Sequence, residues 1–456
     1  MRRVLFLALG MGGLLACGSP PAPDESPPAE SVDARTEAAP AHTEADEAQA
    51  IFEATLLPED SLDAEAPPAA GDSEERVRLT PVERLGKLLF FDRGLSEPSG
   101  QACAVCHGPS VGWTGPELLI NATGSVYEGA VKGRFGNRKP PSSAYATPAP
   151  ILHLKDARKA LFVGGNFWDG RATGEELGNP AADQAQGPFL NPVEQNNPSE
   201  AVVVAKVCRG PYASLFRSVY GSSICQNVAR AYDAIALAIA AYEDSPEVNA
   251  FTSKYDAWLA GRAELSSQER WGLRLFEGKA LCANCHPSQP GPRGKPPLFT
   301  DFTYDNLGVP RNLLNPWYWQ REFNPLGPFW VDYGLGAFLQ TREEWRPFAR
   351  GNLGKVKVPT LRNVDKRPYP GFIKAYGHNG YFKSLESIVH FYNTRDVLPV
   401  CLPEFPGTPG EDCWPPPEVG LNLNTDELGN LGLTPQEEAA IVAFLRTLSD
   451  GYFQRH

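Results

Sequence analysis

Methionine is nearly absent from this chain of 456 residues. The only two methionines are Met1 and Met11, and none follows them. A metal centre in the rest of the chain therefore cannot use a methionine thioether as a ligand, which leaves imidazole, thiolate, phenolate and carboxylate groups. Histidine is also scarce, with 7 in total, so an imidazole ligand must come from a short list of positions.

Long apolar runs are missing too. Residues 4–15 are apolar but too few to span a bilayer, and with Arg2 and Arg3 before them they are typical of a secretory signal peptide. Leu14-Leu-Ala-Cys17 resembles a bacterial lipobox, in which the cysteine is acylated. We expect residues 1–17 to be a lipoprotein signal, the protein to lie in the periplasm or cell envelope, and membrane contact to occur only through a lipid on Cys17. A plain cleavable signal with a free Cys17 is the alternative.

Basic residues are almost missing from the next segment. Residues 18–75 hold sixteen Asp and Glu against the single Arg35 and are rich in Pro, Ala and Ser, so we expect a disordered tether over residues 18–76. The net charge of the whole chain is −12. The acidic segment carries −15 of it and the signal peptide +2, which leaves a net charge of about +1 for residues 76–456. The negative net charge of the chain therefore does not predict a strong electrostatic field around the folded part. Nothing in the sequence predicts a surface that binds nucleic acid.

Two pentapeptides organise the folded part: Cys103-Ala-Val-Cys106-His107 and Cys282-Ala-Asn-Cys285-His286. Each has two thiols at the spacing that adds to the two vinyl groups of one porphyrin, and a histidine that can reach the iron. Zinc would need two more thiols or imidazoles nearby, and neither pentapeptide is followed by any. The sequence therefore predicts two covalently bound haem c groups, with His107 and His286 as iron ligands.

The sequence before each pentapeptide repeats. Residues 79–90 and 265–276 align without a gap, and each stretch opens with a capping box, Thr80-Pro81-x-Glu83 or Ser266-x-x-Glu269. We expect a helix after each box and two further amphipathic helices at residues 228–243 and 434–448. Little alternates with period two, so strands should be minor. The predicted fold is all-α, with cytochrome-c-like domains at residues 77–250 and 251–456 joined to long ordered loops.

Four more cysteines form two local pairs, Cys208 with Cys225 and Cys401 with Cys413. Each pair lies in a loop-like stretch and would close a short loop in an oxidising compartment. We expect disulfides rather than free thiols, provided that the chain is exported.

Residues 287–350 have no helical periodicity but many aromatic residues. The preferred interpretation is a loop packed over a haem edge. The alternative is a surface for electron input or partner docking, because clustered aromatics with arginines are also typical of interfaces. The residues concerned are Trp317, Tyr318, Trp319, Phe323, Phe329, Trp330 and Tyr333, with Arg311 and Arg321.

Further motifs lie between and after the haem sites: Asn166-Phe-Trp-Asp-Gly-Arg171, Gln184-Ala-Gln-Gly-Pro with Asn191-Pro-Val-Glu194, Lys357-Val-Pro-Thr-Leu-Arg-Asn363, and His378-Asn-Gly380. With these motifs the chain resembles the bacterial dihaem cytochrome c peroxidase and MauG family over about residues 79–449. The resemblance implies that the N-terminal (peroxidatic) haem meets hydrogen peroxide and that the C-terminal (electron-transfer) haem stores or relays an electron.

The function implied is reduction of hydrogen peroxide to water, with electrons from a small cytochrome c or a cupredoxin. One alternative is a MauG-like enzyme that oxidises side chains of a partner protein. The other is a dihaem electron carrier without catalysis. The sequence says nothing of the oligomeric state.

Site residues follow from the resemblance by position. Glu194 matches the distal acid–base glutamate, which can take a proton from peroxide and return it to the leaving oxygen. Gln184 matches the glutamine that holds peroxide or water, and Trp168 matches the tryptophan between the haems. Phe167, Arg171 and His378 belong to the same motifs and are expected to contact the haems.

The sixth ligand of the second haem is expected on the helix that contains residues 383–393. Tyr392 stands fourteen residues after His378, where peroxidases of the family place methionine and MauG-type enzymes place tyrosine. His390 is a competitor, but it is two residues away and points to a different helix face, so the two cannot ligate one iron. A third alternative is that no protein side chain occupies this position.

Two departures from the family matter. Members that need reductive activation carry a histidine in the loop after the first haem motif, and residues 123–143 contain none. The first haem is therefore expected to be five-coordinate or water-bound, with His153 as a remote stand-in that is better explained as an ordinary, partly buried histidine. Family members also bind calcium between the domains through an asparagine before FWDGR. Tyr145 falls near that position, so calcium stays open.

Overall fold

The computed structural model describes residues 78–404 and 406–455. The expected signal (1–17) and tether (18–76) lie outside these residues. The described chain is mostly helical, as expected, and its strands form two antiparallel two-stranded sheets, β1 with β2 and β3 with β4. The strands are β1 (His153–Asp156), β2 (Leu161–Val163), β3 (Tyr304–Asp305) and β4 (Val356–Lys357).

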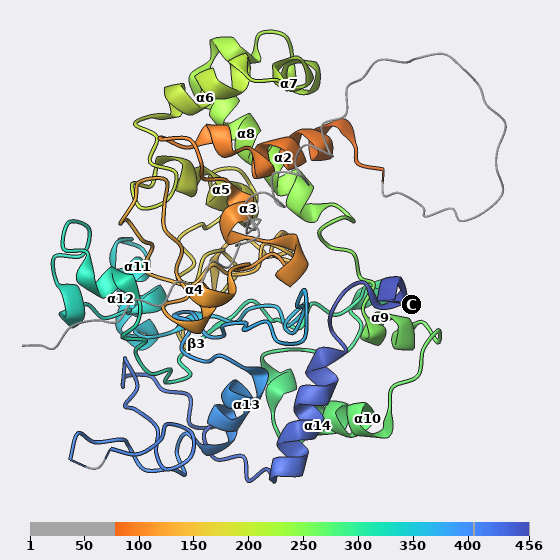
Figure 1. Ribbon diagram of the computed structural model, residues 1–456, viewed down its shortest axis with the longest axis vertical. Helices are drawn as coiled ribbons and strands as arrows, with labels where there is room; N and C mark the ends of the chain where they lie inside the picture. The colour runs from red at the N-terminus through yellow and green to blue at the C-terminus, as the bar shows by residue number, and fades with distance from the viewer. Residues whose placement is uncertain (1–77, 405, 456) are drawn as a thin grey trace, which may run out of the picture. The chain divides into compact units, whose positions relative to one another are not determined.

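The α-helices fall into two sets along the chain (Figure 1). The first set is α2 (Pro81–Phe91), α3 (Cys103–Cys106), α4 (Leu118–Ala122), α5 (Pro180–Leu190), α6 (Glu200–Arg209), α7 (Ala213–Tyr220) and α8 (Val228–Asp244). The second is α9 (Lys254–Leu259), α10 (Ser267–Glu277), α11 (Gly334–Gln340), α12 (Arg346–Ala349), α13 (Leu385–Thr394) and α14 (Pro435–Arg446).

The sequence repeat has a structural counterpart. Both predicted capping boxes are formed, and they start α2 and α10. In the first repeat α2 crosses α8 at Gly86, where a Cβ atom would lie 1.9 Å from the carbonyl oxygen of Ala238. In the second, α10 crosses α14 at Gly272, where a Cβ would lie 1.9 Å from the oxygen of Ala440. The aligned glycines thus allow the same close helix contact twice.

Each crossing lies in its own hydrophobic core. One core collects residues from 85–248 and the other residues from 255–448. The boundary between residues 250 and 251 falls between these two sets and stays a prediction. Both expected disulfides are present, Cys208–Cys225 and Cys401–Cys413.

One sequence expectation needs correction. Residues 287–350 were expected to lack helices, but they contain α11 and α12. Both contribute to a third, small core around Leu335 and Leu339, and α11 also packs on β4. Both helices are short, at seven and four residues, and so carry little periodic signal. None of the described helices is long and apolar enough to cross a bilayer.

Candidate active site

The first haem motif opens into a pocket that we call the N pocket. Short helix α3 carries Cys103 and Cys106 to its wall, and His107 follows at the helix end. The side chains of Gln184 and Glu194 line the same pocket. Phe167, Trp168 and Arg171 line it as well, with the guanidinium of Arg171 stacked 3.7 Å from the centroid of the Phe167 ring. The structure therefore brings the residues of three separate motifs into one cavity.

Local structure explains how Gln184 and Glu194 reach the pocket. Helix α5, which carries Gln184, is held to the loop after the FWDGR motif because Asp183 accepts hydrogen bonds from the backbone N–H groups of Gly174 and Leu177. The turn after α5 then presents Glu194, whose carboxylate accepts a hydrogen bond from Asn191 Nδ2 at 2.7 Å. Burial raises the pKa of Glu194, and the Asn191 contact and the charge of Arg171 oppose this shift only in part.

The second motif opens into another cavity, the C pocket. Cys282, Cys285 and His286 line it, together with Tyr392 from α13 and with His378. His390 faces elsewhere, since its Nδ1 lies 3.0 Å from a carboxylate oxygen of Glu438. The structure thus places the tyrosine, and not the histidine, with the haem motif.

Both motif histidines are oriented in the way that an iron ligand requires. Nδ1 of His107 lies 3.2 Å from the carbonyl oxygen of Trp113, and Nδ1 of His286 lies 2.7 Å from that of Phe299. A ring held through Nδ1 in this way keeps Nε2 for a metal. Burial lowers the pKa of both imidazoles, that of His107 to about 4, so both are neutral near pH 7 and able to bind a metal.

The rest of the cavities also fits a porphyrin. None of the four motif cysteines is part of a disulfide, so each can form a thioether with a porphyrin. Two buried nitrogen atoms that line the pockets have no hydrogen-bond partner in the described structure: Nε1 of Trp317 in the N pocket and Nδ1 of His378 in the C pocket. Such groups are costly to bury unless a partner arrives, and the carboxylates of a haem would provide one.

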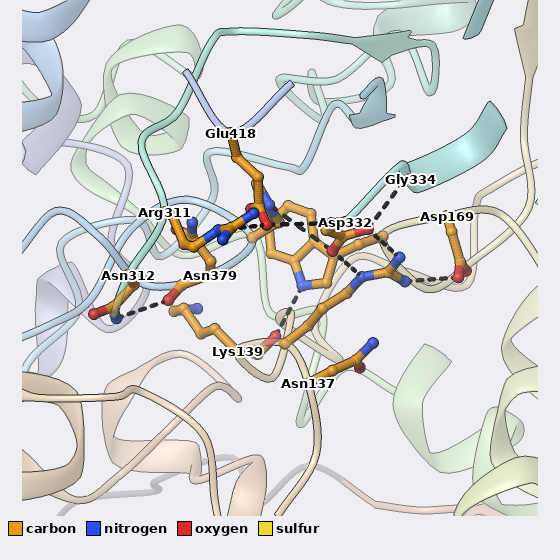
Figure 2. A network of polar contacts seen from close by, with 12 residues as sticks. Asn137, Lys139, Asp169, Arg311, Asn312, Asp332, Gly334, Asn379 and Glu418 are labelled. Atoms are coloured by element: carbon orange, nitrogen blue, oxygen red, sulfur yellow. Dashed lines mark hydrogen bonds and ion pairs between the residues drawn. The ribbon is translucent and has the colours of Figure 1, made fainter. Parts of the chain in front are cut away.

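A shared wall separates the two pockets, and Trp168 is part of it. Its indole N–H donates to the carbonyl oxygen of Lys139 at 2.8 Å. Beside it, Arg138 binds Asp169 at 2.6 Å and Asp332 at 2.6 and 2.7 Å (Figure 2). These ion pairs lower the pKa of both carboxyls despite burial.

His378 closes the same network. Its ring packs against that of Trp168 with centroids 6.4 Å apart, and its Nε2 lies 3.9 Å from Asp332. The wall therefore contains an oxidisable indole beside a largely buried set of charges. Sequence motifs indicated Trp168 and His378, but nothing in the sequence pointed to Arg138 or Asp332, because ion pairs between distant residues leave no local pattern.

Comparison with known proteins agrees with this arrangement. Residues 81–264 match the family described as di-haem cytochrome c peroxidase. The methylamine utilization protein MauG of Paracoccus denitrificans is 35% identical over 393 residues, which are 85% of this chain and 93% of that protein. This chain belongs to the dihaem cytochrome c peroxidase and MauG family. It is an oxidoreductase, and the family implies two c-type haems.

Other family members show the same breadth of match. Cytochrome-c peroxidase IdrP1 of Denitromonas iodatirespirans is 29% identical over 379 residues, or 80% of each chain. Among solved structures, the dihaem peroxidase BthA of Burkholderia thailandensis superposes with a TM-score of 0.65 at 30% identity, covering 82% of this chain and 87% of that one. The relatives include proteins named as peroxidases and proteins named MauG, so they show the chemistry of the family and leave the role of this member open.

The N pocket has no second histidine among the described residues that line it. The histidine present is His107 of the first haem motif. His153 lies outside the pocket on β1. The expectation that His153 is partly buried is wrong, since it is exposed with Nδ1 bound to the carbonyl oxygen of Ile151.

The residues considered for calcium do not fit that ion. Asn166, which immediately precedes the FWDGR stretch, accepts a hydrogen bond from the buried ammonium of Lys357 at 2.6 Å, and Tyr145 donates to Asp450 at 2.7 Å. The one acidic cluster among residues 78–404 and 406–455 is Cys285, Asp305 and Glu427, which includes a haem-motif cysteine. The Asn166 oxygen that would bind the ion is thus already paired with Nζ of Lys357, an amine whose pKa burial lowers to about 7.

Chelation should therefore leave this protein unchanged. We expect the holoprotein to show the same melting temperature and the same absorption spectrum before and after dialysis against EGTA, because Asn166 and Tyr145 already have partners in Lys357 and Asp450. Elemental analysis should find iron but no stoichiometric calcium. A melting temperature that falls on chelation and recovers with added calcium would contradict this expectation.

Glu243 also lines the N pocket, although no sequence motif pointed to it. It lies on α8 and is buried, and burial raises its pKa from 4.5 to about 8. The folded protein then keeps a proton between these pH values that the unfolded chain has lost. The free energy of unfolding should therefore fall as the pH rises through this interval.

A Glu243→Gln variant tests this linkage. Its free energy of unfolding relative to wild type should increase between about pH 5 and about pH 8, because the amide has no proton to lose. Denaturant unfolding of both holoproteins at several pH values measures the difference. Parallel pH curves for the two proteins would show that Glu243 does not titrate with folding.

Proposed function

We propose that this chain is a dihaem c-type peroxidase that reduces hydrogen peroxide to water with electrons from a small redox protein, a cytochrome c or a cupredoxin. The observation that carries the proposal is the buried carboxyl of Glu194 in the same pocket as Cys103, Cys106 and His107. A pure electron carrier has no use for an acid–base group at this place. Membership of a family of oxidoreductases also argues against a carrier.

The two haems would be held by this chain's own motifs. Cys103 and Cys106 would hold one haem through thioethers in the N pocket, with His107 as an iron ligand. Cys282 and Cys285 would hold the other in the C pocket, with His286 as an iron ligand. When bound, the haem in the N pocket supplies the iron that receives peroxide and the electrons that cleave its O–O bond. Phe167 and Arg171 line its pocket, and His378 lines that of the second haem.

Glu194 would move the proton. Its carboxylate accepts a proton from one oxygen of hydrogen peroxide and delivers it to the other, which then leaves as water. Burial raises the pKa of Glu194 towards the working pH, where a group can both accept and return a proton. Gln184, with an amide N–H and a carbonyl oxygen in the same pocket, would orient the peroxide by hydrogen bonds.

Tyr392 would bind the iron of the second haem as its second protein ligand, besides His286. Burial raises the pKa of its phenol well above the usual value, so only direct contact with a ferric iron would hold it as phenolate. Trp168, in the wall between the pockets, would relay electrons from this haem to the first.

The ligand assignment has its own test. Tyr392→Phe should convert the second haem from a low-spin to a high-spin ferric state, visible in the absorption spectrum of the oxidised protein, because phenylalanine offers the iron no ligand atom. His390→Gln, on the same helix, should leave the spectrum unchanged. The reverse result, with a change only in the His390 variant, would exclude Tyr392 as a ligand.

Export through a lipoprotein signal completes the proposal. The two disulfides support an oxidising compartment such as the periplasm. Anchoring would be by a lipid on Cys17. Labelling of growing cells with a fatty acid analogue, with Cys17→Ala as the control, tests the anchor.

The function is tested by mixing the oxidised holoprotein with hydrogen peroxide without prior reduction. We expect a rapid spectral change followed by turnover when reduced cytochrome c is added, because the described N pocket offers no histidine besides His107. A reaction that starts only after reduction would contradict a pocket that is ready for peroxide. No peroxide turnover with any donor would contradict the function.

A MauG-like role is the second candidate, and the 35% identity to MauG over most of both chains favours it. Such an enzyme would oxidise side chains of a partner protein instead of consuming a soluble donor. An oxidised state that persists for minutes and does not consume reduced cytochrome c would favour this candidate over the peroxidase.

A further inference from the structure

The N pocket has a wall residue that no motif accounts for. Trp317, in the 3₁₀ turn Pro316–Trp319, lines this pocket. Its indole N–H is buried and has no hydrogen-bond partner in the described structure. Tryptophan N–H groups usually find an acceptor when they are buried, so the structure points to an acceptor that belongs to the pocket's ligand.

Hydrogen bonds on both sides of Trp317 fix its position in the pocket wall. Gln320 pairs with both backbone groups of Phe135, donating to its carbonyl oxygen and accepting from its N–H at 2.9 Å. Asn315 donates to the carbonyl oxygen of Asn137, a pocket-lining residue, at 2.9 Å. Asn324 donates to the carbonyl oxygen of Trp317 at 3.1 Å. The loop is therefore tied to the pocket on both sides of the tryptophan.

An aromatic chain leads outward from Trp317. The ring of Trp330 packs against it edge to face, with centroids 5.8 Å apart, and also lies 6.1 Å from the ring of Tyr318. Trp330 is only half-buried, so its edge reaches solvent. The indole rings of Trp330 and Trp317 thus form a path from the surface to the pocket with a single contact between them.

The surface around Trp330 is apolar and nearly without net charge. We call residues 313–333 the aromatic loop. Its exposed charged residues are Arg321 and Glu322, whose charges cancel. Its exposed large apolar side chains are Leu313, Leu314, Trp319, Leu326, Phe329 and Tyr333, of which Phe329 is 81% exposed. Patches of this kind are typical of surfaces that meet another protein and need a partner face that is also apolar and weakly charged.

We propose that Trp317 donates its indole N–H to a propionate of the haem in the N pocket, and that Trp330 and Trp317 carry electrons to that haem from a redox protein docked on the aromatic loop. This inference rests on the proposed peroxidase function and adds a route that does not pass through the second haem or Trp168. Reduction of one peroxide to two waters consumes two protons and two electrons. Each electron leaves one donor molecule, which is oxidised by one electron, and each indole returns to its starting state.

Two conservative variants separate the two parts of the proposal. Trp317→Phe removes the N–H and a readily oxidised ring, so the reduction potential of the first haem should fall, because the negative propionate loses its donor, and turnover with reduced horse cytochrome c should fall about tenfold. Trp330→Phe should lower the same turnover by a similar factor and leave the potential unchanged. The rate of the first reaction with hydrogen peroxide, without donor, should stay at the wild-type value in Trp330→Phe, because Trp330 does not line the pocket.

Trp345→Phe is the matched control. Trp345 is another half-buried tryptophan that packs edge to face on Phe162, but it lines neither pocket. Turnover and potential should both stay at wild-type values in this variant. Turnover should also depend little on salt, because the docking surface has no net charge.

The outcomes are distinct. If the wild type turns over with reduced cytochrome c and the Trp317 and Trp330 variants behave like Trp345→Phe, the route is wrong while the peroxidase function stands. If the wild type has no peroxide turnover, the function itself fails. If Trp317→Phe does not bind haem, Trp330→Phe still decides the electron route.

Discussion

Replacing Glu194 by glutamine should lower the rate of reaction with hydrogen peroxide by about 10²–10⁴-fold. Glutamine has nearly the same shape and can keep a contact with Asn191, but it cannot accept a proton from peroxide and return it to the leaving oxygen. Rapid mixing of the oxidised holoprotein with peroxide measures this step directly. The absorption spectrum before mixing should be that of the wild type, because Glu194 is not an iron ligand in this account.

Glu243→Gln is the control for that experiment. Both acids are buried in the N pocket and in both burial raises the pKa, but Glu243 lies on α8, whereas Glu194 lies on the turn after α5. Loss of its carboxyl should change the peroxide rate by no more than a few-fold. A wild-type rate in Glu194→Gln would remove this residue from the mechanism. Equal losses in both variants would indicate a general effect of charge in the pocket.

Replacing Arg138 by methionine should cost about 3–5 kcal/mol of stability. The side chains of Arg138, Asp169 and Asp332 are all nearly buried, with exposed fractions of 10%, 12% and 3%. Removal of the guanidinium leaves Asp332 without its arginine partner and Asp169 with only the more exposed Arg171. Denaturant unfolding of the holoprotein near neutral pH measures the loss.

The pH dependence gives this prediction a second readout. In the folded protein the pKa values of Asp169 and Asp332 lie below their usual range, so the stabilisation is present above about pH 4 and is lost as the pH falls through the folded values. In Arg138→Met this pH-dependent stabilisation should be missing. The free energies of unfolding of the variant and the wild type should therefore converge at low pH. Arg171→Met is the control, because Arg171 pairs with the same Asp169 but is 43% exposed, and it should cost less than about 1 kcal/mol.

Short-range signals predicted a large part of this structure. The capping boxes at Thr80 and Ser266 start helices as expected, and the aligned Gly86 and Gly272 occupy equivalent helix crossings. These features depend on contacts within a few residues or on a repeat that shows itself in the sequence. The disulfides followed from pairs of cysteines close in sequence.

The residues of the site also fall into those that the sequence predicted and those that it did not. Motifs named Glu194, Gln184, Trp168 and Tyr392, and the structure places the first three in the N pocket and Tyr392 in the C pocket. Their roles remain predictions. Arg138 and Glu243 were missed because a buried ionisable group is identified only by the distant groups around it. The two ion-pair partners of Arg138 lie 31 and 194 residues away in the sequence.

The aromatic loop shows why an interpretation from composition stays incomplete. The sequence offered either a cover for a haem edge or a docking surface. Trp317 lines the N pocket, whereas Trp319 and Phe329 are exposed, so neighbouring residues of one loop take different environments. Without a helical or strand period, the sequence gives no rule for which side chain points inward.

The central claim is that the haem in the N pocket has a free coordination position and that the one in the C pocket is closed by Tyr392. An electron paramagnetic resonance spectrum of the oxidised holoprotein tests both parts at once. The account predicts one high-spin ferric signal and one low-spin ferric signal, with the low-spin signal lost in Tyr392→Phe. Two low-spin signals in the wild type, which would require a second side chain on the first iron, would contradict it.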